Sequence, residues 1–394
     1  MTSNCSVPSG PRQQITALFG LLVMMAFSVG AQSPPGVDVT VHATILFSGF
    51  RNAGRVNNID VPTVAVLEAG QTATALGGTV RQTRIGLTVA HESVLGARLF
   101  GELDADFFGG QQPSGGGKTH PLLRVRRAYS ELRWATATLL VGQEAPGLFG
   151  ISPRSIAASG FPQLASAGNL WLWLPQIRFT KWSGSDPNRL RIGIEGSLLA
   201  PNAGTPADPF VTEPDLAEQS GRPTLEGRVV GRWRSAGREG EIGVGGHLGW
   251  LGTDDTRTTS RAFGVSAVAP FGSALEVRGE FFSGQALSGL GGGGIGQNTA
   301  GMRPVETTGG WIQAVVFPGA GIELGFSAGI DDPVDAVLGP SARYRNRAGA
   351  VNLTWRRAPA VAGLEMRRIV TDYRNPDPLT ARATHLHLGM GIEF

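Results

Sequence analysis

Apolar and polar residues alternate along most of this chain with a period of two. The last eleven residues, "THLHLGMGIEF", show the pattern: Leu386, Leu388 and Met390 share one parity, and histidine, glycine and glutamate occupy the other. A period of two is typical of a β-strand whose two faces meet different surroundings. An apolar stripe with the 3.6-residue period of a helix is not sustained anywhere in the sequence. The pattern therefore predicts an all-β protein.

Sixteen segments carry this alternation, and most have about the 9–11 residues of a membrane-spanning strand. The strands are expected at residues 38–50, 80–91, 97–107, 122–134, 137–143, 169–181, 189–199, 224–235, 240–251, 262–270, 275–283, 309–318, 322–330, 344–357, 362–372 and 384–394.

The connections between these segments alternate in length. Seven are short, such as "ESVLG" and "FGSA", and eight are long and rich in Gly, Pro and Ser, such as "FSGQALSGLGGGGIGQNTAG". A soluble β-sandwich gives no reason for this asymmetry, whereas an outer-membrane barrel combines tight periplasmic turns with long extracellular loops. The even number of strands also matches bacterial single-chain barrels. We therefore predict a transmembrane antiparallel β-barrel of about 16 strands in the outer membrane, with the last strand closing against the first.

The placement of charge along the segments agrees with a closed barrel. A sheet in hydrocarbon must pair all of its backbone groups, which it does by closing on itself. In residues 189–199, Ile192 and Ile194 share the apolar parity, and Arg191 and Glu195 share the other. A charge facing lipid near the midplane would cost about 2–4 kcal/mol, so the polar parity is expected to face the lumen. The eight tryptophans lie mostly toward predicted strand ends, where an interfacial girdle would place them.

The N-terminal region has the layout of a secretory signal peptide. Residues 15–29, "ITALFGLLVMMAFSV", form an apolar stretch that is preceded by Arg12 and followed by small residues. We expect residues 1–31 to be the signal peptide and residues 32–394 to form a single barrel domain. The one cysteine, Cys5, lies in the expected signal peptide, so the mature chain would have no disulfide and no thiolate metal site. No later apolar run reaches the ~18 residues of a spanning helix.

Charge and composition narrow the possible functions. Lys+Arg 34 and Asp+Glu 31 give a formal net charge of +3, which does not indicate a nucleic-acid binder. Only Lys118 and Lys181 are lysines, so nearly every cation is a guanidinium, although genomic composition explains that bias as readily as selection does. The six histidines are scattered without HExxH or paired-ligand spacing, and no nucleophile-elbow pattern occurs. We therefore expect no enzymatic activity, no cofactor and no metal site.

Three phrases, in order, resemble the DcaP-like branch of trimeric porins. They are "RQTRIGL" (residues 81–87), "GELDADFFGG" (residues 101–110), and "LRVRRAYSEL" (residues 123–132) leading to "LLVGQEAPGLFG" (residues 139–150). The match covers about 70 residues, and the rest of the chain agrees only in its rhythm of strands and loops. The resemblance implies a barrel of sixteen strands, assembly as a homotrimer, and passage of small, often anionic solutes. The N-terminal coiled-coil extension of some relatives is absent from this sequence.

Acidic and basic residues face each other on two neighbouring predicted strands. Three carboxylates share the polar parity of residues 97–107, and three arginines of residues 122–134 lie across from them within cross-strand reach. The run "RVRRAY" breaks the alternation, and a β-bulge at Arg126 and Arg127 would keep both arginines in the lumen. The candidate pore-lining residues are Arg84, Glu102, Asp104, Asp106, Arg124, Arg126, Arg127, Arg154, Arg191, Arg228 and Arg232, with Arg178, Arg189, Arg278 and Arg367 as further arginines of lumen parity.

Two interpretations of this cluster remain open at the level of sequence. In one, the carboxylates neutralise the arginines and brace the wall of the barrel. In the other, an excess of fixed guanidinium faces the pore and raises the local concentration of anions. Arginine suits either role, because its planar fork binds carboxylate or phosphate and stays charged at any relevant pH.

The third long connection is a candidate constriction loop. Residues 144–168, "EAPGLFGISPRSIAASGFPQLASAG", carry Glu144 and Arg154 as their only charges. A barrel of sixteen strands is wide enough for an aqueous channel, so selectivity needs a narrower point. A loop that stays outside the barrel is the alternative. His385 and His387, on the polar parity of the last strand, are expected to be solvated in the lumen.

These patterns predict an outer-membrane porin for passive diffusion of small hydrophilic solutes, favouring anions such as carboxylates. Its expected partners are those solutes, outer-membrane lipid and two further copies of the chain. The alternative is a structural or surface-interaction barrel whose lumen is plugged by its long loops.

Overall fold

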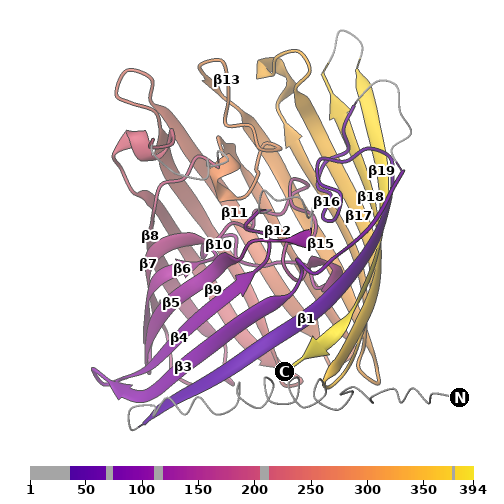
Figure 1. Ribbon diagram of the computed structural model, residues 1–394. Helices are drawn as coiled ribbons and strands as arrows, with labels where there is room; N and C mark the ends of the chain where they lie inside the picture. The colour runs from indigo at the N-terminus through magenta and orange to yellow at the C-terminus, as the bar shows by residue number, and fades with distance from the viewer. Residues whose placement is uncertain (1–35, 68–73, 111–118, 205–212, 375–377) are drawn as a thin grey trace, which may run out of the picture.

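Antiparallel strands form nearly all of the regular structure in the computed structural model (Figure 1). It describes residues 36–67, 74–110, 119–204, 213–374 and 378–394. Among these residues, no helix has the length and the apolar character that crossing a membrane requires. The expected signal peptide, residues 1–31, lies outside the described residues.

Seventeen strands form one continuous sheet, and the short hairpin of β13 and β14 stands apart from it. The strands are β1 (Val37–Ala53), β2 (Thr74–Thr79), β3 (Arg84–Val94), β4 (Ala97–Asp106), β5 (Arg124–Trp134), β6 (Ala137–Glu144), β7 (Leu174–Trp182), β8 (Arg191–Leu199), β9 (Thr224–Ser235), β10 (Arg238–Leu251), β11 (Thr258–Phe271), β12 (Leu275–Gln285), β13 (Thr299–Ala300), β14 (Arg303–Pro304), β15 (Glu306–Gly319), β16 (Ile322–Pro333), β17 (Arg343–Arg357), β18 (Ala360–Tyr373) and β19 (Leu379–Glu393).

The sheet closes on itself because β1 pairs along both of its edges. One edge pairs with β19 over ten residues, from Thr44 to Ala53. The other edge pairs with β3 and β2. The backbones of Ala43 and Phe394 add two hydrogen bonds, of 2.8 and 3.1 Å. Among the described residues the strands thus form a closed ring, which is what a sheet needs in order to cross hydrocarbon. The predicted closed antiparallel barrel is confirmed.

The predicted second strand, residues 80–91, is wrong at its start, because β3 begins only at Arg84 and an extra strand, β2, lies before it in the expected long connection. Both strands pair with the same edge of β1, so the seventeen strands fill sixteen positions in the wall. Thr83 lies at the break, where its Oγ1 accepts from the amide of Leu46 at 3.0 Å and donates to the carbonyl of Leu46 at 3.3 Å. A side chain thus replaces the missing ladder bonds, as buried backbone groups require.

We expect Thr83→Val to lower the free energy of unfolding by about 1–3 kcal/mol, because the buried amide of Leu46 would lose its partner. The matched control is Thr88→Val on β3, which is expected to change stability by less than about 0.5 kcal/mol. Urea unfolding of the barrel in lipid vesicles measures both. Equal stabilities of the two variants would contradict the proposed role of Thr83.

Short turns lie at one end of the barrel and the longer connections at the other (Figure 1). Ala236 and Gly237 join β9 to β10, and Ala320 and Gly321 join β15 to β16. All four residues have positive φ, of 49°, 78°, 51° and 75°. Positive φ at both central positions is the geometry of a type I′ turn, whose twist matches that of two paired strands. The predicted alternation of tight turns and long loops is confirmed.

The outward side chains are apolar across the middle of the wall. On β8, Ile194 is 69% exposed, whereas the next residue, Glu195, is 7% exposed. The register pairs Glu195 with Arg228 of β9, which also points inward. Exposed apolar side chains of this kind recur around the sheet, far beyond what a soluble monomer exposes. The outer face is therefore suited to lipid and the inner face to polar groups.

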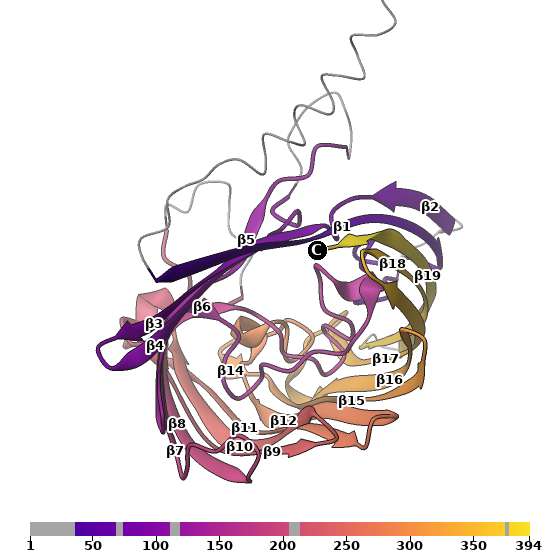
Figure 2. The ribbon, with the colours of Figure 1, turned by 90° about the horizontal axis from the view of Figure 1, so that it is seen from below.

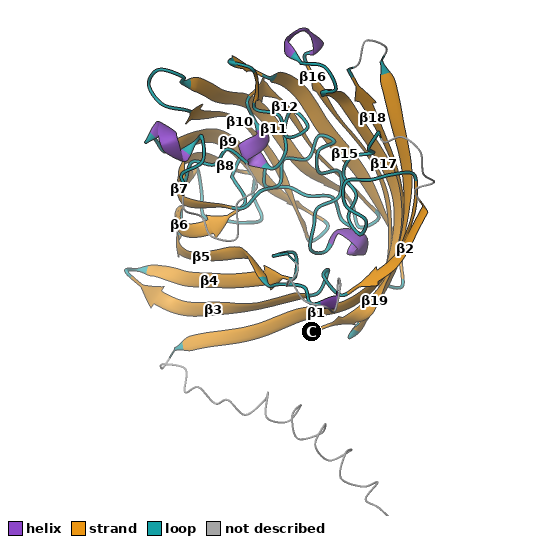
Figure 3. Ribbon diagram, turned by 45° about the horizontal axis from the view of Figure 1, so that its top comes forward, coloured by secondary structure: helices purple, strands orange, loops and turns teal. Residues whose placement is uncertain are grey.

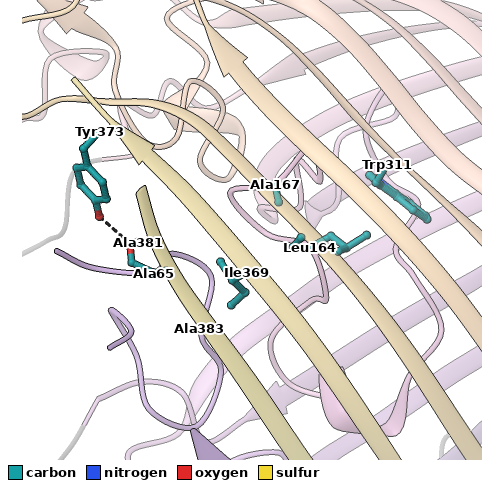
Figure 4. Close-up of a cluster of buried hydrophobic side chains, with 9 residues drawn as sticks. Ala65, Leu164, Ala167, Trp311, Ile369, Tyr373, Ala381 and Ala383 are labelled. Carbon is teal, nitrogen blue, oxygen red and sulfur yellow. Dashed lines mark hydrogen bonds between the residues drawn. The ribbon is translucent and has the colours of Figure 1, made fainter. Parts of the chain in front are cut away.

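Part of the interior is packed with apolar side chains from connections and from the inner wall (Figure 4). Ala65, from the connection after β1, and Leu164, from the connection after β6, belong to a cluster with Trp311, Ile369 and Tyr373. The hydroxyl of Tyr373 donates to the carbonyl of Ala65 at 2.7 Å. Two connections are thereby held against β15 and β18 inside the barrel.

The expected tryptophan girdle is wrong for several of its members. Trp311 is 4% exposed and Trp182 is 7% exposed, because both have inward parity. Trp171 and Trp173 lie outside the strands, with ring centroids 5.3 Å apart. Trp355 faces outward and is 37% exposed, as a girdle residue would be.

Candidate functional site

The connection between β6 and β7, residues 145–173, runs inside the barrel (Figure 2 and Figure 3). We call it the inner loop; it extends beyond the expected residues 144–168, because β7 begins only at Leu174. The amide of Arg154 donates to Oε1 of Gln313 on β15 at 2.7 Å, and Nε2 of Gln313 donates to the carbonyl of Arg154 at 2.9 Å. The alternative of an external loop is contradicted by these bonds.

One anchor of the inner loop is the buried carboxylate of Glu365 on β18. The hydroxyl of Ser155 donates to Oε2 of Glu365 at 2.5 Å, and Nε2 of Gln163 donates to the same oxygen at 2.7 Å. Arg367 donates to the other oxygen at 2.7 and 3.0 Å. Glu365 and Arg367 are 2% and 3% exposed, so this ion pair is enclosed between the wall and the loop.

A second anchor lies farther round the wall, at the break between β2 and β3 and on β5, with β19 and β1 between it and β18. Gln82, in the break between β2 and β3, donates to the carbonyl of Ala157 at 2.9 Å and accepts from the amide of Gly160 at 2.6 Å. On β5, Arg126 donates to the carbonyl of Ser159 at 2.9 Å, and Arg124 donates to that of Gly160 at 3.2 Å. The inner loop therefore contacts the wall on several sides, and its path is set by polar side chains of the barrel.

The glycine-rich connection after β12 also packs into the barrel, although the sequence placed it at the surface. Leu287 and Leu290 of this connection are almost fully buried, in a cluster with Leu170 of the inner loop. The amide of Leu172 donates to the carbonyl of Leu290 at 3.3 Å. The apolar residues of the inner loop thus have partners inside the barrel.

The acidic strand β4 and the basic strand β5 form a ladder of ion pairs. Arg124 binds Asp106 through two hydrogen bonds, of 2.7 and 3.0 Å. The register shifts by one residue at Arg126, which is the β-bulge that the run of arginines predicts. The nitrogens of Arg126 lie 3.7 Å from Asp104 and 3.5 Å from Asp106.

The ladder continues toward the open lumen through Arg127. This residue pairs with Glu102, lies 3.3 Å from Asp104, and lies 3.5 Å from Glu144 at the end of β6. Arg84 on β3 pairs with Asp104 from the other side. The predicted cluster of carboxylates and arginines across these strands is present. Most of its charges are paired with one another within the wall.

A second group of ion pairs lies on β8, β9 and β10. Arg228 donates to Glu195 at 2.9 Å and to Glu241 at 3.0 Å, and Arg232 donates to Glu241 at 2.6 Å. Glu241 was not among the predicted site residues, because its register with Arg232 depends on how β9 and β10 pair. Arg191 also lies on the inner face, with its guanidinium 5.0 Å from the ring centroid of Trp182.

Arg154 lies apart from both groups, against β16. It pairs with Glu323 at 3.0 Å, and Arg356 of β17 pairs with the same carboxylate at 2.8 Å. Burial lowers the pKa of Arg154, but the hydrogen bond and charge of Glu323 outweigh it, so the pKa lies above its usual value. Arg154 therefore stays charged and fixes the inner loop to the wall.

Two of the further arginines, Arg278 and Arg189, occupy different surroundings. Arg278 pairs with Glu276 and donates to the carbonyl of Ser152 at 2.8 Å, which is another contact with the inner loop. Arg189 is 86% exposed in a turn and pairs with Asp186, so its expected lumen position is wrong. It lies before the start of β8, and the parity of that strand does not apply to it.

A cavity of about 380 Å³ lies between the first residues of the inner loop and the wall from β5 to β11. It is lined by four arginines, three glutamates and residues of the inner loop. The charged residues are Arg127, Arg178, Arg228, Arg232, Glu144, Glu239 and Glu241. Arg178 donates to the carbonyl of Ala145 at 3.2 Å and forms no ion pair with a carboxylate in the described part of the chain. The charge of Glu144 acts on it, but it is the one arginine of this cavity without a salt bridge among the described residues.

The expectation that His385 and His387 are solvated is wrong. Each is 2% exposed, and Nδ1 of His385 lies 2.7 Å from Oδ1 of Asn52 on β1. Ile156 of the inner loop packs with Leu46 in the same region of the inner wall. The inner loop covers these histidines, which parity alone could not reveal.

His42, Glu102 and Asp104 offer potential metal-ligand atoms within 4.8 Å of one another. Both carboxylates are already bound by guanidinium groups, Glu102 by Arg127 and Asp104 by Arg84 and Arg127. A cation would have to displace those arginines, so the donor set favours the ion-pair ladder over a metal.

No protein-family model and no curated protein sequence matches this chain. Solved structures, however, match nearly all of it. The outer membrane channel DcaP of Acinetobacter baumannii has a TM-score of 0.65 at 16% identity, covering 92% of this chain and 99% of that one. The anion-selective porin from Comamonas acidovorans has a TM-score of 0.54 at 11% identity, covering 91% and 100%. OmpT of Vibrio cholerae has a TM-score of 0.55 at 7% identity, covering 92% and 99%.

Identities this low show the fold alone, and that fold is the porin β-barrel. Together with the closed wall and the apolar outer face, it makes the chain an outer-membrane β-barrel protein with a porin-like channel architecture.

Proposed function

We propose that this protein is a passive channel for small hydrophilic solutes across the outer membrane, with a preference for anions such as carboxylates. The observation that supports it best is the cavity beside the inner loop, where four arginines face three glutamates and Arg178 has a carbonyl partner but no salt bridge among the described residues. A fixed guanidinium without a salt bridge raises the local concentration of anions and offers them a planar pair of donors.

Selection in such a channel needs no covalent chemistry. The ion pairs of β4, β5, β9 and β10 hold the wall and the inner loop in place. The width that remains sets a size limit, and the excess positive charge sets the preference for anions. The two interpretations of the arginines are thus combined: most of them brace the wall, and Arg178 is left for the solute.

Two similarities point in the same direction. DcaP is described as an outer membrane channel, and the Comamonas protein is described as an anion-selective porin. The sequence phrases that resemble trimeric porins are the basis for proposing that three copies of this chain assemble. We propose no enzymatic activity and no cofactor.

A barrel closed by its own loops is the second candidate. It is favoured by the burial of residues from three connections in the interior, such as Ala65, Leu164 and Leu287. In that case the protein would be a structural or surface-interaction barrel and would not pass solutes.

Conductance in a planar bilayer separates the two candidates. The purified protein is expected to insert with discrete, ohmic steps of conductance. In a potassium chloride gradient, the sign of its reversal potential should be that of an anion-selective channel. Steps with a cation-side reversal potential would contradict the anion preference. Inserted protein that remains silent, with folding verified by heat-dependent mobility in gels, would support the plugged barrel.

A further inference from the structure

A group of arginines lies on the outer face of the barrel, where most of the exposed side chains are apolar. On β17 the inward parity contains Asn346 and Ala348, both buried, so Arg345 and Arg347 have the outward parity. Arg368 on β18 and Arg382 on β19 are likewise exposed between buried neighbours. We call Arg345, Arg347, Arg368 and Arg382 the outer arginine patch.

The strand register brings these side chains close to one another. Val370 of β18 lies between Arg347 and Arg382, its partners on the two sides. Arg368 lies two residues from Val370 on the same face, and so is diagonal to both arginines. Diagonal neighbours in a sheet are about 7–8 Å apart, which long side chains span. Three guanidinium groups can therefore converge on one ligand.

The patch carries an excess of positive charge. Asp372 lies 2.9 Å from both Arg345 and Arg347, and the charge of Asp332 on the neighbouring strand β16 acts on both as well, so two carboxylates offset part of the charge of the four arginines. Arg368 donates to the hydroxyl of Thr384 at 2.7 Å, and neither Arg368 nor Arg382 has a carboxylate partner among the described residues. Like charges held together on an apolar wall repel one another, so an anionic ligand would relieve the repulsion.

The height of the patch matches the outer boundary of the membrane. On β17, the outward residues between Arg347 and Arg357 are Gly349, Val351, Leu353 and Trp355. Ten residues rise about 33 Å along a strand, or about 25 Å at the usual tilt, which is the height of the apolar band of such barrels. Arg357 lies at the end with short turns, so the patch lies at the end with long loops, where the outer leaflet has its headgroups.

Directly below the patch, the apolar surface is grooved. One groove of about 680 Å³ is lined mainly by apolar residues, among them Leu364, Met366 and Leu386, and also by Arg51 of β1. A second, of about 500 Å³, has Arg368 among its lining residues. If an anionic lipid bound its headgroup at the patch, its acyl chains would lie in these apolar grooves.

We propose that the outer arginine patch and the grooves below it bind a phosphorylated, multiply acylated glycolipid of the outer leaflet, of the lipid A type. Arginine binds phosphate through its planar fork, and each basic residue near a membrane surface adds to the attraction for anionic lipid. A lipid supplies both the phosphate that the arginines need and the chains that fill the grooves. A second copy of this chain would have to bring its own carboxylates to the same height.

Native mass spectrometry of the full chain in detergent tests this site with two purified probes, bis-phosphorylated lipid A and its dephosphorylated form. The wild-type protein is expected to bind the phosphorylated form about tenfold more tightly. The variant Arg368→Gln/Arg382→Gln is expected to lose that difference. Arg357→Gln, which removes an exposed outward arginine at the opposite rim, should keep it.

Several results would overturn the proposal. Equal binding of the two probes by the wild-type protein would overturn it. That result does not depend on whether any variant folds. Unchanged lipid A binding by the double variant would exclude the patch as the site. Equal affinity for phosphatidylglycerol would show general attraction of anionic lipid, and a changed number of subunits with unchanged lipid binding would show a subunit contact.

Discussion

Replacing Glu365 with glutamine is expected to destabilise the barrel and to make its conductance unsteady, which is the largest effect on stability that the structure predicts. Glu365 neutralises Arg367 and accepts hydrogen bonds from Ser155 and Gln163 of the inner loop. Removing one member of a buried ion pair leaves the other without compensation, at a cost of about 3–5 kcal/mol. The loss also releases two contacts of the inner loop. Urea unfolding in vesicles and single-channel recording measure the two effects.

A double variant separates stability from the position of the inner loop. Glu365→Leu/Arg367→Met removes both charges, and apolar pairs of similar size often restore or exceed the stability of a buried ion pair. The loop would still lack its contacts at Ser155 and Gln163, so the recordings should stay noisy while unfolding returns toward the wild-type value. Quiet recordings of wild-type conductance in both variants would show that the inner loop does not depend on Glu365.

The strands could be predicted from the sequence because each one separates two solvents. Lipid outside and polar groups inside impose the same period of two on every strand, whatever its neighbours are. The phrase "NLWLWLP" shows where the pattern misleads, because residues 169–173 alternate like a strand and yet belong to the inner loop. Leu170 and Leu172 find apolar partners in the connection after β12. A loop packed inside the barrel can show the same alternation of apolar and polar residues as a strand of the wall.

The break between β2 and β3 could not be predicted from the sequence for a related reason. Gln82 and Thr83 leave the ladder to bind the inner loop and β1, and neither contact is close along the chain. His387 follows the same logic, since its parity is inward as expected but the lumen around it is filled. Parity says which way a side chain points, and the folding of distant loops decides what it meets there.

The candidate site was predictable in its members but not in their pairing. The carboxylates of β4 and the arginines of β5 were matched because a short range of sequence separates the two strands. The partners of Arg228 were missed, because Glu195 and Glu241 depend on the registers of β8 with β9 and of β9 with β10. Which arginine stays without a carboxylate is a property of all these registers together. Arg178 was therefore only one of several equivalent candidates in the sequence.

The change Arg178→Glu is expected to abolish the anion preference, because it alters the charge of the cavity by two units. A unit charge about 7 Å away in water changes the energy of an ion by about 0.6 kcal/mol, or roughly threefold in local concentration. Two units acting in opposite directions on anions and cations should lower the permeability ratio at least tenfold. Reversal potentials in a salt gradient measure that ratio. Arg178 contacts the carbonyl of Ala145 and its charge acts on Glu144, so folding of the variant is verified by heat-dependent mobility in gels before the recordings are compared.

Arg189→Glu is the matched control, because it makes the same change in net charge at a residue that is 86% exposed in the turn after β7. Its charge lies outside the cavity and is screened by salt within about 10 Å at 0.1 M ionic strength. The control channel should therefore keep the wild-type reversal potential. Equal shifts in the two variants would mean that net charge acts on the channel from a distance. An unshifted Arg178→Glu channel would mean that solutes pass elsewhere in the lumen, and the cavity beside the inner loop would lose its assigned role.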